Sequence, residues 1–402
     1  MSPQALQIRR YDDLASLEAL RGPWNDLLAE FPGATVFCTL EWLLAWWHAF
    51  GAGRQLHVVA FVESDGRLAG VAPLSLVRET RGPVALKSMR MMGDGSGDSD
   101  SLDFPVRAGC EGAVAAALMH HLKVEQHLWE VCRFNTLPAD SPVARALAPL
   151  IGSAGWVHYT TGTMTQAIDL PEAWAEYLSQ LSSNEREKVS RRPRKLAKTH
   201  QVHLYKCDTE SDLSACLSVL FDLHQKRWTS SGEPGSFGSA ERRQFYGEMA
   251  KAFLVRGWLE FWLLDVDGVP VAAQFGFRYR QTFFILQEGF EPALAGESVG
   301  FVLRAHVLKY LIESGVRRYD FMAGQEPAKA RWGARPGQYL NMHFARPRSA
   351  GGLYLQAVNE AGAAKEYLRE HLPQPAWDLL HRINLRLRGA ASSNTKQKSG
   401  PS

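Results

Sequence analysis

Residues 259–279, LEFWLLDVDGVPVAAQFGFRY, decide the fold of this 402-residue chain. Two largely apolar runs flank Asp267-Gly268, a dipeptide that is typical of tight turns between antiparallel strands. The same arrangement stands 202 residues earlier, around Asp65-Gly66 in residues 57–77, HVVAFVESDGRLAGVAPLSLV. A pattern that recurs along the chain predicts two similar halves, each built on one hairpin.

The elements that follow each hairpin also correspond. A further strand, a glycine-rich loop, a helix and another strand are expected in both halves. Strands that alternate with single helices indicate an α/β or mixed α+β fold, which here means two tandem lobes, each a mixed sheet flanked by helices. The four elements are expected at 84–92, 92–101, 111–126 and 128–137 in the first half, and at 282–290, 291–300, 299–314 and 317–324 in the second.

The most unusual composition lies between the two halves. Residues 186–198, REKVSRRPRKLAK, hold seven basic side chains and one acid, and Pro193 interrupts a helical pattern that begins near Pro171. These features predict a kinked basic arm. The expected divisions are an N-terminal lobe (1–165), the basic helical arm (166–205), a C-terminal lobe (206–348), a C-terminal helical segment (349–388) and a disordered tail (389–402).

The overall composition fits an ordinary globular chain. The formal net charge is +3, which is too small to indicate a polyanion partner for the whole molecule. The five cysteines are scattered and never form a Cys-x-x-Cys pair, so we expect no disulfide framework and no metal site. No stretch has the length and apolarity of a signal peptide or a membrane span, and we expect a cytoplasmic protein. Residues 37–51, FCTLEWLLAWWHAFG, repeat aromatic side chains at helical spacing and are expected mainly in the core.

The segment Gly296-Glu297-Ser298-Val299-Gly300 joins a loop to the start of a helix. Free backbone amides and the helix dipole at such a start favour an anion, so a phosphate group could bind there. Ser298 is expected to be the N-cap, and Gly300 would let a ligand approach the first turn. An ordinary capped helix is the alternative interpretation.

A second candidate is HQKRW at 224–228, near the end of an amphipathic helix and before a Gly- and Ser-rich stretch. His224, Lys226 and Arg227 together suit a site that holds an anionic or sugar-like acceptor. Trp228 completes the cluster. A solvated helix end, whose cations favour the C-terminal dipole, is an equal alternative.

Three polar residues stand in or beside apolar strands. Asp320 is costly to bury unless it is paired or functional, which makes it a candidate base, or a partner of Arg317 or Arg318. Glu288 ends an apolar strand and is either a proton acceptor or an exposed strand-end carboxylate. Gln274 is polar in the middle of a strand that is expected to be buried, and we expect it to contact an amide in a cleft.

An ordered series of motifs resembles the acetyltransferase family named for cellulose biosynthesis (CelD/BcsL type). That family belongs to the GNAT superfamily and is related to the Fem-type ligases. The resemblance spans about residues 30–345. Its motifs are FCTLEWLLAWWHAFG, SRRPRKLAK, HQKRW, DGVPVAAQFGF, ESVG and RRYDFMAGQEPAKARWG.

This resemblance implies two tandem GNAT-like lobes in a Fem-like arrangement, with acetyl-CoA or another acyl-CoA bound by the second. Pantetheine would run beside the strand that ends at Glu288, and the pyrophosphate would meet Gly296, Ser298, Val299 and Gly300. The loop departs from the usual superfamily pattern because Glu297 brings a carboxylate near the pyrophosphate.

The expected activity is N-acyl transfer to an amine, or a hydroxyl, of a sugar-containing acceptor, in cellulose, exopolysaccharide or envelope biosynthesis. Asp320 or Glu288 would take the proton. The alternatives are a Fem-like transferase that binds aminoacyl-tRNA through the basic arm 186–198, and a non-catalytic scaffold of a polysaccharide assembly. His224 is a third catalytic candidate. The residues expected to bind the substrate are Lys226, Arg227, Trp228, Gln274 and Lys329.

Overall fold

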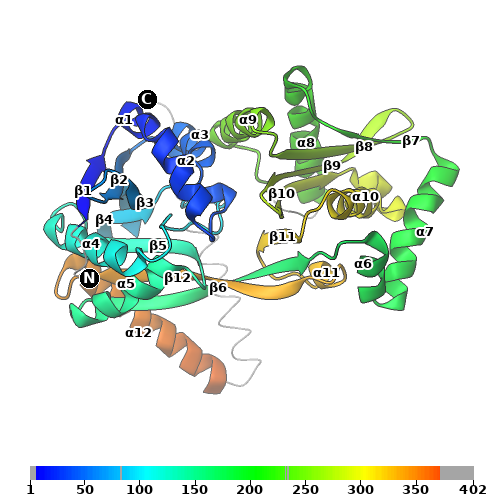
Figure 1. Cartoon of the computed structure of the whole chain (residues 1–402). Coiled ribbons are helices and arrows are strands. Elements are labelled where there is room, and N and C mark those ends of the chain that lie inside the picture. The colour runs from blue at the N-terminus through cyan, green and yellow to red at the C-terminus, as the bar shows by residue number, and fades with distance from the viewer. Residues whose placement is uncertain (1–5, 82–83, 231, 233–234, 372–402) are drawn as a thin grey trace, which may run out of the picture.

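A computed structural model describes residues 6–81, 84–230, 232 and 235–371. In this part of the chain twelve strands form one mixed sheet, in the order β1-β2-β3-β4-β5-β12-β6-β11-β10-β9-β8-β7. Figure 1 shows the two halves side by side, with β6 and β12 running between them. The strands are β1 (Gln7–Tyr11), β2 (Arg54–Val62), β3 (Leu68–Arg81), β4 (Val84–Met91), β5 (Val131–Pro138), β6 (Val157–Asp169), β7 (Val202–Lys206), β8 (Leu259–Val266), β9 (Val269–Tyr279), β10 (Thr282–Phe290), β11 (Arg318–Ala323) and β12 (Arg335–Ala345).

Helices cover the sheet in both halves, so the predicted mixed fold is confirmed. The helices are α1 (Leu14–Ala19), α2 (Arg21–Glu30), α3 (Leu40–Phe50), α4 (Glu111–Val124), α5 (Pro142–Ser153), α6 (Trp174–Gln180), α7 (Ser183–Thr199), α8 (Glu210–Ser230), α9 (Ala240–Val255), α10 (Val299–Glu313), α11 (Pro327–Ala330) and α12 (Ala350–His371), with short 3₁₀ turns η1 (Val36–Cys38) and η2 (Pro292–Glu297).

The two hairpins form where the sequence predicts them. β2 pairs with β3, and β8 pairs with β9, both antiparallel. In the second turn Asp267 and Gly268 have φ angles of 54° and 81°, the left-handed conformation that this turn type needs at both central residues. The dipeptide Asp267-Gly268 was sufficient to predict this second turn, because a two-residue turn is specified by its own sequence.

The last strands of the two halves are exchanged. β6 comes from the first half of the chain but pairs with β11, and β12 comes from the second half but pairs with β5. β6 and β12 also pair with each other, from Val157↔Ala345 to Ala167↔Arg335. The expected lobe boundary at residue 165 therefore falls inside β6, and the two lobes share one continuous sheet.

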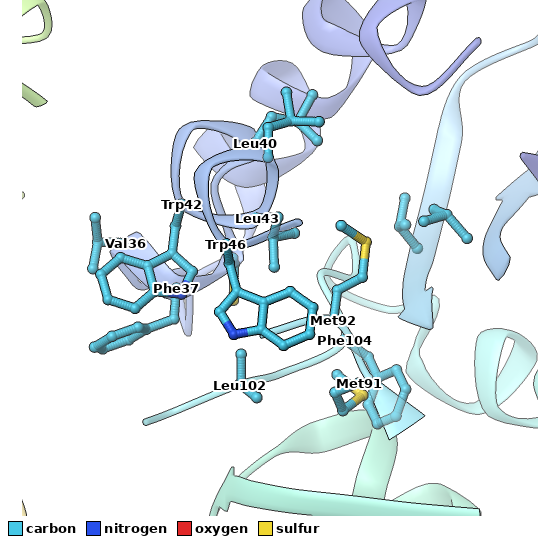
Figure 2. Close-up of a cluster of buried hydrophobic side chains, with 14 of the residues drawn as sticks. Val36, Phe37, Leu40, Trp42, Leu43, Trp46, Met91, Met92, Leu102 and Phe104 are labelled. Atoms are coloured by element: carbon cyan, nitrogen blue, oxygen red, sulfur yellow. The ribbon is translucent and has the colours of Figure 1, made fainter. Parts of the chain in front are cut away.

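The aromatic run near the N-terminus is buried, as the spacing predicts. Phe37, Trp42 and Trp46 lie in the core beside Met91, Met92, Leu102 and Phe104 (Figure 2). Ring centroids of Phe37 and Trp42 lie 5.8 and 5.6 Å from that of Phe277 on β9. One hydrophobic core thus joins the first half to the second, which fixes the two lobes against each other.

The basic arm forms two helices, α6 and α7, and its break is not where we expected it. Ser182 separates them, and its hydroxyl accepts the Glu185 N–H at 3.3 Å. Pro193 lies inside α7, which continues to Thr199. The N-cap at Ser182 starts the helix, and Pro193 removes one backbone donor without ending it.

The C-terminal helical segment begins as expected with α12. The rest of that segment and the expected tail, residues 372–402, lie outside the described residues. Among the helices that are described, none has the length and apolarity to cross a membrane.

Candidate active site

The sheet opens between β10 and β11. These strands are parallel and pair only from Thr282↔Arg318 to Phe284↔Asp320. β10 runs on to Phe290, and its register against β9 shifts between Ile285 and Gln287. Beyond Phe284 the described residues provide no strand partner on the β11 side, so backbone groups of β10 line an open edge. Two cavities lie along this opening.

The first cavity, called here the α10 cavity, lies at the N-terminus of α10 and measures about 300 Å³. Among the described residues its lining holds five cationic and two acidic side chains. Glu185 is paired with Lys188 at 2.7 Å, and Glu288 is paired with Arg304, so the cations remain in excess. The cations are Lys188 and Arg192 of α7, Arg227 of α8, Arg304 of α10 and Arg331 after α11.

The start of α10 is uncapped in the described structure. Ser298 has φ 58° and ψ 38°, and its side chain makes no capping hydrogen bond, so the expected capping role is wrong. A left-handed residue turns its side chain away from the first turn, which leaves the backbone amides there without that partner. Ser298, Val299 and Gly300 line the α10 cavity, whereas Gly296 lies outside the described lining. An anion in this cavity would meet the helix amides.

Glu297 does not oppose an anion in this cavity. Its carboxylate lies 3.5 Å from Nζ of Lys195 on α7 and is not part of the described lining. Glu297, whose carboxylate departs from the usual loop pattern, therefore faces the basic arm, where the charge of Lys195 partly neutralises it.

Aromatic rings hold the cations of the α10 cavity in place. The guanidinium of Arg192 lies 4.5 Å from the Phe301 ring centroid, and that ring lies 4.4 Å from the Trp332 ring. Arg304 lies 5.6 Å from Trp332 and 5.3 Å from Phe321. Cation–π contacts restrict these long side chains without neutralising their charge, which favours binding of an anion.

Glu288 and Arg304 form a bidentate ion pair at the junction of the two cavities. Nε of Arg304 donates to Oε1 of Glu288 at 3.1 Å, and a second guanidinium nitrogen donates to Oε2. Both side chains line both cavities. Glu288 is therefore not a solvated strand-end carboxylate, because its two oxygens are held by Arg304.

The second cavity, called here the strand-end cavity, measures about 360 Å³ and lies where β10 and β11 have parted. It takes in Leu286, Gln287 and Glu288 from the open edge of β10 and Lys329 from α11. Nζ of Lys329 lies 3.4 Å from the carbonyl oxygen of Phe321. Further lining comes from Gly97 and Asp100 of the first half, Arg227 and Trp228 of α8, and Met322, Ala323 and Glu326.

Asp100 is a site residue that the sequence reasoning missed. Its Oδ2 accepts the Ala323 N–H at 2.6 Å, so a carboxylate of the first half reaches the end of β11 in the second. Burial raises the pKa of Asp100 to about 6, although the Ala323 N–H opposes that shift. The signal was present as four acids in the glycine-rich stretch Gly93–Asp103, all of which are buried.

The other acids of that stretch fix it in place. Asp98 lies 3.0 Å from Arg242 and accepts the Tyr246 hydroxyl at 3.1 Å, both on α9. Asp103 accepts the Ser141 hydroxyl at 2.6 Å. Asp94 accepts from Arg90 at 2.7 Å and from Asn135 at 2.9 Å. The segment is thus fastened to both halves.

The HQKRW cluster divides between the core and the cavities. His224 is buried between Phe237 and Trp228, with ring centroids at 4.8 and 5.8 Å. Burial, helped by the charge of Arg227, lowers the pKa of His224 to about 4, so the ring is neutral at pH 7. Lys226 is exposed and pairs with Asp222 and Glu291 at 2.9 and 3.1 Å. Of the described cluster residues, Arg227 and Trp228 line the strand-end cavity, whereas His224 and Lys226 do not.

Asp320 faces a different cavity. It lines a space of about 830 Å³ between the halves, together with Arg318 and Tyr339. Its Oδ1 accepts the Met322 N–H at 2.7 Å, and its Oδ2 lies 3.5 Å from Nε of Arg318. Burial raises its pKa, and Arg318 opposes that shift. Asp320 and Glu288 therefore share no described cavity, because Glu288 lines only the α10 cavity and the strand-end cavity.

Gln274 is fully buried on β9, directly opposite Glu288 in the β9–β10 register. Neither its Oε1 nor its Nε2 has a hydrogen-bond partner among the described residues. Gln274 is not part of the described lining of the α10 cavity or of the strand-end cavity, so the structure does not place the expected amide contact in either.

Comparisons with known proteins found one matching family model and solved structures of similar fold. Residues 183–330 match the model of the acetyltransferase (GNAT) domain. The crystal structure of FemX has 12% sequence identity and a TM-score of 0.58, with 83% of this chain and 96% of FemX covered. A conserved protein of unknown function from Bacteroides thetaiotaomicron VPI-5482 has 14% identity and a TM-score of 0.51, with 85% of this chain and 100% of that chain covered. No curated protein sequence gave a match.

The matched segment runs from the start of α7 through the last residue of α11, so it includes most of the lining of both cavities. Arg331 and Trp332 of the α10 cavity and Gly97 and Asp100 of the strand-end cavity lie outside it. The similarity to FemX concerns the fold, and it extends across both lobes. Residues 183–330 are therefore similar to a GNAT acetyltransferase domain, and the two-lobed fold of the chain is similar to that of FemX.

Proposed function

We propose that this protein is an N-acyltransferase that moves an acyl group from acyl-CoA to the amine of a sugar-containing acceptor. The observation that carries the proposal is the α10 cavity, where an uncapped helix start and an excess of cations face one space inside the GNAT domain. Backbone amides at a helix start and guanidinium groups are the donors that phosphate oxygens prefer.

The residues present fit the phosphates of coenzyme A. The amides of Val299 and Gly300 would face the pyrophosphate, and Lys188, Arg192 and Arg331 would surround it. A thioester of coenzyme A supplies an activated acyl group when bound. The Glu288–Arg304 pair at the junction of the cavities would hold the passage through which the acyl arm reaches the strand-end cavity.

The open edge of β10 would polarise the acyl carbonyl. Backbone amides past Phe284 that lack a β11 partner are donors fixed by the sheet. Donors that are already oriented stabilise a developing oxyanion without reorganising, which is a large contribution in acyl transfer. Positioning of the acceptor nitrogen against the same edge would supply most of the remaining rate enhancement.

The strand-end cavity would take the acceptor. Trp228 is 38% exposed at its rim and offers a flat apolar face for a sugar ring. Arg227 and Lys329 would meet hydroxyl or anionic groups of the same ligand. A place in cellulose or exopolysaccharide biosynthesis is a proposal that depends on the resemblance to the CelD/BcsL type family.

Calorimetry with acetyl-CoA tests the donor. We expect binding to the wild-type protein and a loss of roughly tenfold in affinity for Arg192→Ala and for Arg331→Ala, because each removes one phosphate partner. Arg194→Ala is the matched control, since Arg194 is exposed on the same helix and outside the described lining of the cavity. No binding at millimolar acetyl-CoA would contradict the proposal and favour a non-catalytic scaffold.

The outer face of α7 keeps a second candidate open. Arg191, Arg194, Lys195 and Lys198 are exposed there, next to the cations of the α10 cavity. Such a stripe suits a nucleic-acid backbone, as in a transferase that takes its acyl group from aminoacyl-tRNA. Salt-sensitive tRNA binding that is lost in the triple variant Arg191→Ala, Arg194→Ala, Lys198→Ala would favour this candidate over acyl-CoA.

A further inference from the structure

We infer that Asp100 of the first half is the group that takes a proton from the acceptor, so that the active site is shared by the two lobes and its acceptor is a primary amine. The inference rests on the proposed acyl transfer and names the residue and the acceptor class that the GNAT domain alone does not supply.

The geometry places Asp100 at the reaction centre. Ala323, whose N–H donates to Oδ2 of Asp100 at 2.6 Å, is the last residue of β11. At this level β10 and β11 have already separated, and Leu286 and Gln287 of the open β10 edge line the same cavity as Asp100. An acyl carbonyl held by that edge would therefore face the carboxylate across the strand-end cavity.

The other carboxylates of the cavity are less suited to this task. Both oxygens of Glu288 are occupied by Arg304. Glu326 is 61% exposed and lies 3.6 Å from Lys329, so it is a solvated rim residue that is paired with a cation. Asp100 is 7% exposed, and the described residues supply a hydrogen bond to its Oδ2 only. Its Oδ1 is left for a ligand.

The charges around Asp100 suit a base that works near neutral pH. Burial is the main reason why its pKa rises to about 6, and Asp320 on β11 and Asp98 on its own segment add to the rise. The Ala323 N–H and Lys329 on α11 act in the opposite direction. Tyr339 of β12 lies close and is neutral, because burial raises its pKa well above the usual range. Arg227, Glu288, Arg304 and Glu326 line the rest of the same cavity.

The segment that carries Asp100 is held rigidly against the second half. Asp98 is bound by Arg242 and Tyr246 of α9, and Asp103 by Ser141 of α5. These are positioning residues for Asp100. A carboxylate that is fixed between two anchored neighbours loses little freedom when it meets the substrate.

The chemical step balances with Asp100 as the acceptor of one proton. The ammonium of the acceptor gives a proton to Oδ1, and the neutral nitrogen attacks the thioester carbonyl carbon. A C–N bond forms, the C–S bond breaks, and the second proton of the nitrogen leaves with sulfur as the free thiol. Asp100 returns its proton to water, so that amide, thiol and one proton are the products.

The acceptor class follows from comparing the pKa of each possible nucleophile with the pKa of the Asp100 carboxyl group. An alkyl ammonium with a pKa of about 10 can pass its proton to a carboxylate of pKa about 6 at modest cost, and it is also attracted by the negative charge. Water and simple alcohols, with pKa values of about 16, are far less acidic than such a base can deprotonate efficiently. A primary amine is therefore the favoured nucleophile over a hydroxyl.

The test uses full-length protein, acetyl-CoA and d-glucosamine as the amine probe, over pH 5 to 9. For the wild type we expect amide formation whose kcat/KM rises with pH through about 6. Asp100→Asn should lower kcat by about 10²–10⁴-fold and abolish the rise of kcat/KM through about pH 6, with the KM for acetyl-CoA unchanged. Asp265→Asn is the control, because Asp265 on β8 is another acid whose pKa is raised by burial, and it lies outside the described lining of both cavities. Its kcat and pH profile should stay those of the wild type.

The possible failures are distinguishable. An Asp100→Asn variant with wild-type kcat and pH profile overturns the role of Asp100 and leaves the proposed function intact. A wild-type protein that binds acetyl-CoA in calorimetry but acylates no amine, with ethanolamine and lysine as further probes, overturns the amine acceptor. Absence of acetyl-CoA binding overturns the proposed function itself. Far-ultraviolet circular dichroism of both variants confirms that they are folded.

Discussion

The opening between β4 and β5 corresponds to the opening between β10 and β11. In both places a parallel ladder of three residue pairs ends while one or both strands continue. The first ladder runs from Ser88↔Val131 to Arg90↔Arg133, and the second from Thr282↔Arg318 to Phe284↔Asp320. The two halves therefore carry the same sheet defect at matching positions, and they differ in what occupies it.

In the first half the opening is filled by a network of buried charges. Arg90 donates to Asp94 and Glu79, and Arg133 lies 3.6 Å from Glu79. Asn135 donates to Asp94 at 2.9 Å. In the second half the ion pair of Glu288 and Arg304 lies between two cavities, and the cations around it exceed the acids. Charges that satisfy one another stabilise a fold, whereas an excess of one sign beside open space is available to a ligand.

The segments after the two openings differ in the same sense. Residues 291–298 lead directly to the uncapped start of α10, which faces a cavity. The segment Gly93–Asp103 is longer and crosses to the second half, where Asp98 and Asp100 bind α9 and β11. The first lobe thus contributes to the site of the second.

The largest expected effect comes from breaking the filled opening. Arg90→Ala would remove the cation that Glu79 and Asp94 share and leave Glu79 with Arg133 alone, at a cost of about 3–5 kcal/mol in the free energy of unfolding. Denaturant unfolding measures it. Arg78→Ala, on an exposed position of the same strand β3 as Glu79, should change the unfolding free energy by less than about 0.5 kcal/mol. If Arg90→Ala lowers the free energy of unfolding no more than the control does, the network does not stabilise the fold.

The corresponding change in the second half should act on activity more than on stability. Arg304→Ala removes the partner of Glu288 at the junction of the cavities, and we expect kcat/KM with acetyl-CoA to fall roughly 10²–10³-fold. Arg304→Lys keeps the charge but loses the bidentate geometry, so its activity should lie between that of the wild type and that of Arg304→Ala. Steady-state kinetics at saturating acceptor measures the effect, and equal activity of all three proteins would contradict it.

Asp103 should make stability depend on pH. Burial raises its pKa to about 7, while the Ser141 hydroxyl and the Phe104 N–H oppose the rise. The folded state then holds more protons than the unfolded state between about pH 4 and 7, so stability should fall as pH rises through that window. Asp103→Asn keeps an oxygen for both donors but cannot ionise, and the decline in Tm from pH 5 to pH 7.5 should become shallower. An unchanged slope would contradict this origin of the pH dependence.

The smallest expected effect concerns the acceptor. Trp228→Ala should raise the KM for the amine acceptor by about tenfold and leave the KM for acetyl-CoA unchanged. The reason is that Trp228 lines the strand-end cavity and is not part of the described lining of the α10 cavity. Tyr310→Ala is the control, since Tyr310 is exposed to a similar degree, 39% against 38%, on the outer part of α10. An equal rise in the KM for both substrates would indicate that Trp228 contacts the donor as well as the acceptor.

Local elements could be predicted from the sequence, and pairings between distant segments could not. The hairpins, β10 and α10 were predictable because turn dipeptides and apolar periodicity are encoded within about twenty residues. The exchange of β6 and β12 depends on a ladder between strands about 180 residues apart, on which no local pattern bears. Ser298 was assigned as a side-chain cap from residue type alone, whereas the residue stands at the junction of η2 and α10 with a left-handed backbone.

The candidate site was predictable in part for the same reason. Arg227, Trp228, Lys329 and the α10 start each belong to one of the quoted motifs, and Glu288 ends an apolar strand, so a local pattern could select these residues, which line the cavities. The helix pattern did not show that His224 faces the core rather than the cavity. Asp100 comes from the other lobe, and its relevance depends on how two halves pack, which a motif in either half does not record.

The exchange of final strands has a consequence for synthesis on the ribosome. The edge of β5 that is completed by β12 stays uncovered until residues 335–345 have emerged, although β5 itself is finished at residue 138. An exposed strand edge is a template for unwanted pairing. A nascent first lobe of this protein must therefore wait, incomplete, until the chain has been translated through β12, and a fragment that stops between the lobes should require a chaperone or aggregate.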